Sequence, residues 1–187
     1  CELDLMPSFH NFTGDVISRA AFGSNFEEGR RIFQLLREQT TVLLKAARST
    51  HIPGWRFVPT ETNKRYYEIH HQISSLISGI IHKKEEVMKR GEGKPDDLLG
   101  MLLNSNAQEI EEHGGKKNGM NLDEIINECK LFYFAGQETT NYLLLWSMIL
   151  LSKHQNWQDR ARKEVFEIFW KNQPTNDGMH RLKTVGM

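Results

Sequence analysis

The stretch Leu131-Phe-Tyr-Phe-Ala-Gly-Gln-Glu-Thr-Thr-Asn141 lies within an apolar run, from about residue 121 to residue 153, that predicts one long helix. Five consecutive residues in its middle, Gly136 to Thr140, are poor choices for a helix interior. Glycine there costs about 1 kcal/mol relative to alanine. Threonine is β-branched, and its hydroxyl can bond back to the carbonyl four residues earlier, which for Thr139 is that of Ala135. Such local exceptions often mark a functional site.

Several positions of this stretch share one face of the predicted helix, because they fall three or four residues apart. They are Phe132, Ala135 or Gly136, Thr139 and Leu143. The face is bulky, then nearly bare, and then carries a hydroxyl, with Glu138 beside it but rotated away. One interpretation places a flat cofactor against the bare patch, with the hydroxyl and the carboxyl supplying protons. The other is a helix crossing, in which small residues let a second helix approach and Thr139 caps its own backbone. Spacing alone favours the crossing.

The totals describe a chain of 187 residues, which is enough for one domain with a substantial core. Its 24 basic and 24 acidic residues leave no net charge that would indicate a nucleic acid or an acidic partner. Cys1 and Cys129 fit no zinc or disulfide pattern, so a reduced environment is the default. No apolar run approaches the ~20 residues of a membrane span. The chain begins at Cys1 and both ends look cut, so we interpret it as an internal piece of something longer.

Helical periodicity predicts an all-α chain without strand pairs. The expected helices lie within residues 1–22, 27–47, 60–90, 98–102, 121–153 and 156–170. Asn121 and Glu124 resemble a capping box at the start of the central helix, and Asp96 or Asp97 caps the short helix before it. Residues 104–119 are polar and glycine-rich and are expected to form a mobile surface loop. The first helix is expected to bury an apolar stripe made of Phe9, Phe12, Val16, Ile17 and Ala20.

The segment from 49 to 59 is unusually apolar for a loop, with Ile52, Trp55, Phe57 and Val58 around a Pro-Gly turn. It could pack under a lid or touch a membrane surface. It could equally pack on a neighbouring helix, and the residues do not decide between these interpretations.

The motif Ala135-Gly136-Gln137-Glu138-Thr139-Thr140 resembles the central-helix motif of the cytochrome P450 superfamily, the haem-thiolate monooxygenases. Trp157-Gln158-x-x-Ala161-Arg162-x-Glu164-Val165 looks like the following helix of the same fold. Further stretches are similar to a plant family that includes secologanin synthase and oxidases of triterpenoids. They are 1–4, 15–19, 21–24 and 52–60. The resemblance covers essentially the whole chain, so the expected fold is the all-α central part of a cytochrome P450 domain, a single partial domain over residues 1–187.

The resemblance implies roles for the residues that match the motif. Ala135, Gly136 and Thr140 would contact the haem on its distal side. Thr139 would hydrogen-bond dioxygen at the haem and help to deliver protons, with Glu138 as its acidic partner, and Phe132 would face the substrate. These roles suit a reaction that needs protons delivered to one oxygen in an otherwise dry site.

The resemblance also implies partners and a location. Electrons would come from NADPH through a membrane-bound flavoprotein reductase, and the substrate would be a hydrophobic small molecule such as a terpenoid. An N-terminal anchor, missing here, would hold the protein on the cytosolic face of the endoplasmic reticulum membrane.

Two signatures of the superfamily are absent from these 187 residues. The axial cysteine would stand in a loop of the form Phe-x-x-Gly-x-Arg-x-Cys-x-Gly, which neither Cys1 nor Cys129 matches. The family's Glu-x-x-Arg pair, expected beyond the helix at 156–170, is absent as well. We therefore expect the chain as written to be inactive and of low stability by itself. The alternative is a non-catalytic helical binding or interaction protein, or a pseudogene relic, in which the glycine and threonine patch is a close helix crossing.

Overall fold

The structure, a computed structural model, describes residues 3–23, 26–47, 58–91, 96–112 and 119–184. In these ranges it contains helices and no strand, which confirms the all-α prediction. The helices are α1 (Met6–Phe22), α2 (Phe26–Ala47), α3 (Glu61–Lys89), α4 (Leu98–Glu112), α5 (Leu122–Lys153), α6 (Gln155–Phe169) and α7 (Asn176–Met179). Two compact units, 1–141 and 142–187, are described here separately. Whether they form one domain stays a prediction.

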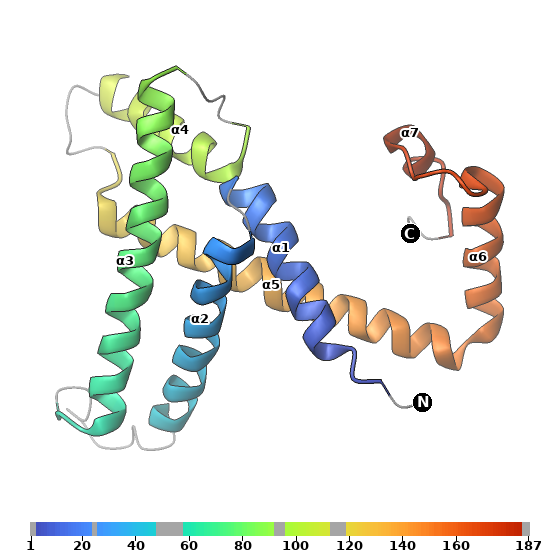
Figure 1. Cartoon of the computed structure of the whole chain (residues 1–187), viewed down its shortest axis with the longest axis horizontal. Helices are drawn as coiled ribbons and strands as arrows, with labels where there is room; N and C mark the ends of the chain where they lie inside the picture. Colours follow the sequence, from blue (N-terminus) through green and yellow to red (C-terminus); the bar gives the residue numbers. More distant parts are fainter. Residues whose placement is uncertain (1–2, 24–25, 48–57, 92–95, 113–118, 185–187) are drawn as a thin grey trace. The chain divides into compact units, whose positions relative to one another are not determined.

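The first unit holds α1 to α4 and the part of α5 up to Asn141 (Figure 1). Its apolar core draws side chains from all five helices, and Tyr133 of α5 is among the largest that are fully buried. The Tyr133 ring stacks on Phe22 of α1, with centroids 4.0 Å apart, and meets the edge of Phe33 of α2 at 5.1 Å. Aromatic packing therefore fixes α5 against α1 and α2.

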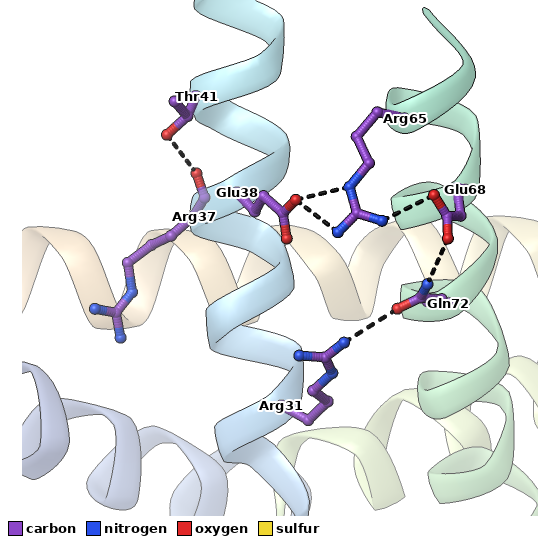
Figure 2. A network of polar contacts seen from close by, with 7 residues as sticks. All are labelled: Arg31, Arg37, Glu38, Thr41, Arg65, Glu68 and Gln72. Atoms are coloured by element: carbon purple, nitrogen blue, oxygen red, sulfur yellow. Dashed lines mark hydrogen bonds and ion pairs between the residues drawn. The ribbon is translucent and has the colours of Figure 1, made fainter. Parts of the chain in front are cut away.

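The helices α2 and α3 lie side by side and are also joined at their surface. Figure 2 shows the Arg65 guanidinium between two carboxylates, at 2.7 Å from Glu38 of α2 and 2.8 Å from Glu68 of its own helix. Arg31 extends the network to Gln72 at 3.3 Å. Because these groups are exposed to solvent, the network adds little to the stability of the fold.

The expected apolar stripe of α1 is wrong for most of its residues, although Ile17 packs against the core. Phe12 and Val16 are exposed, whereas the buried face consists of Thr13, Gly14, Ser18, Ala21 and Phe22. Most of these side chains are small, and small residues let neighbouring helices approach the α1 backbone closely. A hydrophobicity pattern ranks them low, so it selects the wrong side of the helix.

Several helix ends match their sequence signals. Asn121 and Glu124 form the reciprocal capping box, with distances of 2.7 and 3.1 Å. The carboxylate of Asp97 accepts a hydrogen bond from the Gly100 amide at 2.8 Å at the start of α4. The expectation of a loop from residue 104 is wrong as far as residue 112, because α4 continues through that segment. Of the rest of that expected loop, residues 113–118 lie outside the described residues. The expected apolar loop also lies outside them as far as Phe57.

In the second unit, the last turns of α5 are followed by α6 and α7. The Glu164 carboxylate of α6 accepts hydrogen bonds from the backbone amides of Lys183 and Thr184, at 2.6 and 2.9 Å. Gly178 of α7 packs directly under the ring of Phe169. These contacts tie the end of the described chain back onto α6.

Within the described ranges, none of the helices combines the length and the apolar character needed to cross a membrane. The same residues contain no group of three or more His, Cys, Asp or Glu side chains suited to holding a metal ion.

Candidate functional site

In the first unit, α5 has a buried side and an open side, and the candidate site residues are divided between them. The buried stripe is Ile126, Cys129, Tyr133, Gln137 and Asn141. It follows the three- and four-residue spacing of one helix face. About half a turn away, Leu131, Phe134, Ala135 and Thr139 are exposed. On this open side the Thr139 hydroxyl lies next to the small residue Ala135.

The Thr139 hydroxyl lies where the sequence predicts. It donates a hydrogen bond to the carbonyl oxygen of Ala135, with the two oxygen atoms 2.5 Å apart. Both residues are exposed, so the hydroxyl rests on the backbone of the open side and can rotate toward a ligand there. Thr140, the next residue, is also exposed.

Gly136 is turned away from this open side. A Cβ atom added to Gly136 would lie 2.5 Å from Cδ1 and 2.8 Å from Cγ1 of Ile17 on α1. The expectation that Ala135 and Gly136 form one bare patch is therefore wrong for Gly136, because α1 occupies the space beside it. At this residue the helix-crossing interpretation describes the geometry. Phe132 packs partly against the core, and its role toward a substrate stays a prediction.

This crossing yields a first prediction. Gly136→Ala should lower the free energy of unfolding by about 1–3 kcal/mol, because β-branched Ile17 has little freedom to move away. Gly79→Ala is the matched control: it also lies within a helix, and an added Cβ meets nothing within 4 Å. That control should stabilise by about 1 kcal/mol. Urea denaturation of both variants measures the contrast. Equal effects would show that Ile17 does not restrict the size of residue 136.

Glu138 is half-buried between the two sides of α5. Its charge is felt by His10 of α1, whose pKa lies below the ordinary value. Burial is the main cause of that lowering and the positive charge of Arg37 adds to it, while the carboxylate of Glu138 acts in the opposite direction. At neutral pH the imidazole is therefore uncharged. The structure thus places a titratable side chain of α1 near the predicted acidic partner of Thr139.

Two polar residues of α5 that carry no predicted role lie in the buried stripe. The Gln137 side-chain amide donates to the carbonyl oxygen of His10 at 3.1 Å. The Asn141 amide nitrogen lies 3.3 Å from His10 Nε2 and 3.7 Å from the sulfur of Met6. A signal for these residues exists in the sequence. They continue the four-residue spacing of Cys129 and Tyr133, which places polar groups on a core-facing stripe.

The described residues suit one side of a haem group, and the family's cysteine loop is not among them. A flat group could lie on the open side of α5, where Ala135 is small and the Thr139 hydroxyl stands beside it. Cys129, the cysteine among the described residues, faces the core and not the open side of α5. Burial, with a smaller effect of Glu128, raises the pKa of the thiol to about 12, so it stays protonated at neutral pH. The chain therefore fits the distal side alone.

Comparison with known proteins gives a consistent result. The cytochrome P450 family model matches residues 2–186. Cytochrome P450 CYP72A219 of Panax ginseng is 52% identical over 187 residues. Secologanin synthase 1 and 7-deoxyloganic acid hydroxylase of Catharanthus roseus are each 51% identical. The matches cover all of this chain, which spans 36% of the length of each of these relatives.

A solved structure shows the same fold. The crystal structure of the cytochrome P450DA heme domain matches 99% of this chain with a TM-score of 0.73 and 22% sequence identity. This chain covers 38% of that one.

Proposed function

The chain belongs to the cytochrome P450 family, and from this premise we propose that it forms the distal, oxygen-handling side of a haem-dependent monooxygenase. The open side of α5 carries the proposal, because an apolar surface there holds one small residue, Ala135, beside one mobile hydroxyl, that of Thr139. The haem, when bound, supplies the reduction of dioxygen that inserts one oxygen atom into a C–H bond and releases the other as water. The cysteine loop that would hold the haem iron is absent from these 187 residues.

The residues of this chain handle protons and exclude water. In the structure the Thr139 hydroxyl donates to the carbonyl oxygen of Ala135. Rotation of this side chain frees the proton for an oxygen atom on the open side. Glu138, one residue away and half-buried, then replaces the proton. Exposed Leu131 lies on the same side of α5 and adds apolar surface near the hydroxyl.

The substrate class, the partners and the location extend the proposal. Two relatives are named as a secologanin synthase and a 7-deoxyloganic acid hydroxylase, and these names support a hydrophobic, terpenoid-type substrate of plant specialised metabolism. Electrons would come from NADPH through a flavoprotein reductase. Both proteins would lie on the cytosolic face of the endoplasmic reticulum, held there by a membrane anchor outside these residues. Phe132 and Thr140 would contribute to the walls of the site.

The test places the chain in a complete relative. A chimaera in which this chain replaces the matching third of secologanin synthase 1 should bind haem and give the family's reduced carbon-monoxide absorption band. Thr139→Ala in the chimaera should keep that band. It should lower the ratio of product formed to dioxygen consumed by about 100-fold, the lower end of what a positioned proton donor contributes.

The matched control is Thr41→Ala. Thr41 is an exposed helix threonine whose hydroxyl also bonds back to a carbonyl four residues earlier, that of Arg37, at 3.0 Å. The control should leave the ratio unchanged. A chimaera without the band refutes the proposed cofactor, and an unchanged ratio in Thr139→Ala refutes the role of the hydroxyl.

A further inference from the structure

Where α1 crosses α5, three polar residues form a cluster next to the segment that carries the two proposed relay residues. It consists of His10 on α1 and of Gln137 and Asn141 on α5. The two α5 residues flank the segment 138–140, one on each side. Both residues contact His10. The Gln137 amide binds the backbone carbonyl oxygen of His10 at 3.1 Å, and the Asn141 amide lies 3.3 Å from the His10 ring. One residue of α1 therefore holds both ends of the turn that carries Glu138 and Thr139.

This cluster is a costly way to pack two helices. Asn141 is completely buried and Gln137 nearly so. Asn141 Oδ1 and His10 Nδ1 are buried and have no hydrogen-bond partner among the residues that the structure describes. A buried polar atom that lacks a partner destabilises the folded state, and leucine at position 141 would continue the apolar stripe without that cost. Groups retained against stability are typical of functional sites.

We propose that His10 is a positioning residue for the relay, which holds Glu138 and Thr139 in place through Gln137 and Asn141. This inference rests on the proposed function. The charged groups facing His10 are Arg37 from α2 and Glu138 from α5. Figure 2 shows the Arg37 side chain extending from α2 away from the ion pairs that Arg65 forms with Glu38 and Glu68. The neutral ring keeps one nitrogen as an acceptor for the Asn141 amide.

Two variants distinguish the contribution of the His10 ring from that of the His10 backbone carbonyl. In the chimaera, His10→Leu removes the contact with Asn141 but keeps the carbonyl that Gln137 binds. It should keep the reduced carbon-monoxide band and lower the ratio of product to dioxygen by about tenfold, the size of effect typical of an outer residue that orients a reacting group. His10→Gln should restore the ratio, because its amide reaches about as far as Nε2 of the ring.

A third variant tests the cost of the cluster. Asn141→Leu should leave the thermal midpoint of the chimaera unchanged or raise it, while it lowers the ratio about as much as His10→Leu does. A merely structural cluster would instead lose stability and keep its ratio.

A readout without haem uses the 187-residue chain itself. Hydrogen–deuterium exchange of the backbone amides of 137–141 should become about three- to tenfold faster in His10→Leu, the equivalent of one hydrogen bond or slightly more. His10→Gln should restore the slow exchange, and His154→Leu, at an exposed residue of the second unit, should change nothing there.

The outcomes distinguish the two proposals. A chimaera that shows the band and responds to Thr139→Ala, but keeps its ratio in His10→Leu and in Asn141→Leu, overturns the role of His10 and leaves the proposed function intact. Failure of His10→Gln to restore either readout also overturns positioning by the ring. If Thr139→Ala has no effect while hydrogen exchange in 137–141 changes in the His10 variants as expected, His10 does position this segment and the proposed function is refuted.

Discussion

Tyr133→Ala is expected to lower the free energy of unfolding of the first unit by about 3–5 kcal/mol, as large-to-small substitutions of buried aromatic residues do. Tyr133 is completely buried. Its ring stacks on Phe22 with an interplanar angle of 5° and meets Phe33 nearly at right angles, at 79°. Alanine would lose both ring contacts and leave a cavity where α1, α2 and α5 meet.

The cavity would persist because the surrounding helices are held elsewhere. Gly136 rests on Ile17, and Gln137 is bound to the backbone of His10, so α1 cannot move freely toward the vacated space. A site that cannot collapse loses both the transfer free energy of the ring and the contacts of the atoms that lined it. We therefore expect a loss toward the upper end of the range.

Urea denaturation followed by circular dichroism measures this effect. Leu131→Ala is the control, since Leu131 lies on the same helix two residues away but is 56% exposed. It should change the free energy of unfolding by no more than about 0.5 kcal/mol. Similar losses in the two variants would mean that α5 does not pack through Tyr133 as the structure shows.

The parts of the fold that depend on local chemistry could be predicted from the sequence. The capping box of Asn121 and Glu124 needs only residues three positions apart, and it fixes the start of α5. The bond from the Thr139 hydroxyl to the Ala135 carbonyl is equally local. Such interactions are set by the backbone of a single helix, so a sequence pattern determines them before any neighbouring helix is considered.

The parts that depend on which helix faces which could not be predicted in this way. Spacing alone allows either Ala135 or Gly136 to share a face with Thr139. Successive helix residues are about 100° apart, however, so these two neighbours face different sides of α5. Ile17 decides that Gly136 belongs to the crossing. The buried face of α1 is unpredictable for the same reason. Small residues such as Gly14 and Ser18 are buried there because they let a neighbouring helix approach closely, and hydrophobicity does not reveal this.

The candidate site contains both residues that a local motif predicts and residues that depend on contacts between helices. The motif identifies Glu138 and Thr139 through its resemblance to a family, and the open position of Thr139 in the structure is consistent with that role. The sequence gives no role to His10 because its partners, Gln137 and Asn141, lie 127 and 131 positions away along the chain. A contact of that separation is visible only once the helices are placed.

Asp97→Ala is the second substitution expected to have a large effect. The Asp97 carboxylate caps α4 through the Gly100 amide at 2.8 Å and forms an ion pair with Lys84 of α3. The side chains of Lys84 and Asp97 are only 17% and 10% exposed. Loss of the cap costs about 1 kcal/mol. Leaving the shielded ammonium of Lys84 without its partner adds to this, so we expect a total of about 3 kcal/mol.

The exposed neighbour Asp96 provides the control, because the sequence alone leaves the choice of cap open between the two residues. Asp96→Ala should change the free energy of unfolding by less than about 0.5 kcal/mol. If Asp96→Ala costs as much as Asp97→Ala in urea denaturation, the cap of α4 has been assigned to the wrong residue.

Asp97→Asn separates the cap from the charge. The amide oxygen of asparagine can still accept the hydrogen bond from Gly100, and asparagine is as good a cap as aspartate, so the loss in this variant comes from Lys84. Lys84→Met in the same background removes the stranded ammonium and should recover most of that loss. A double-mutant cycle measures the coupling directly. If Lys84→Met recovers nothing, the two side chains do not interact in solution, and Asp97 acts on α4 through its cap alone.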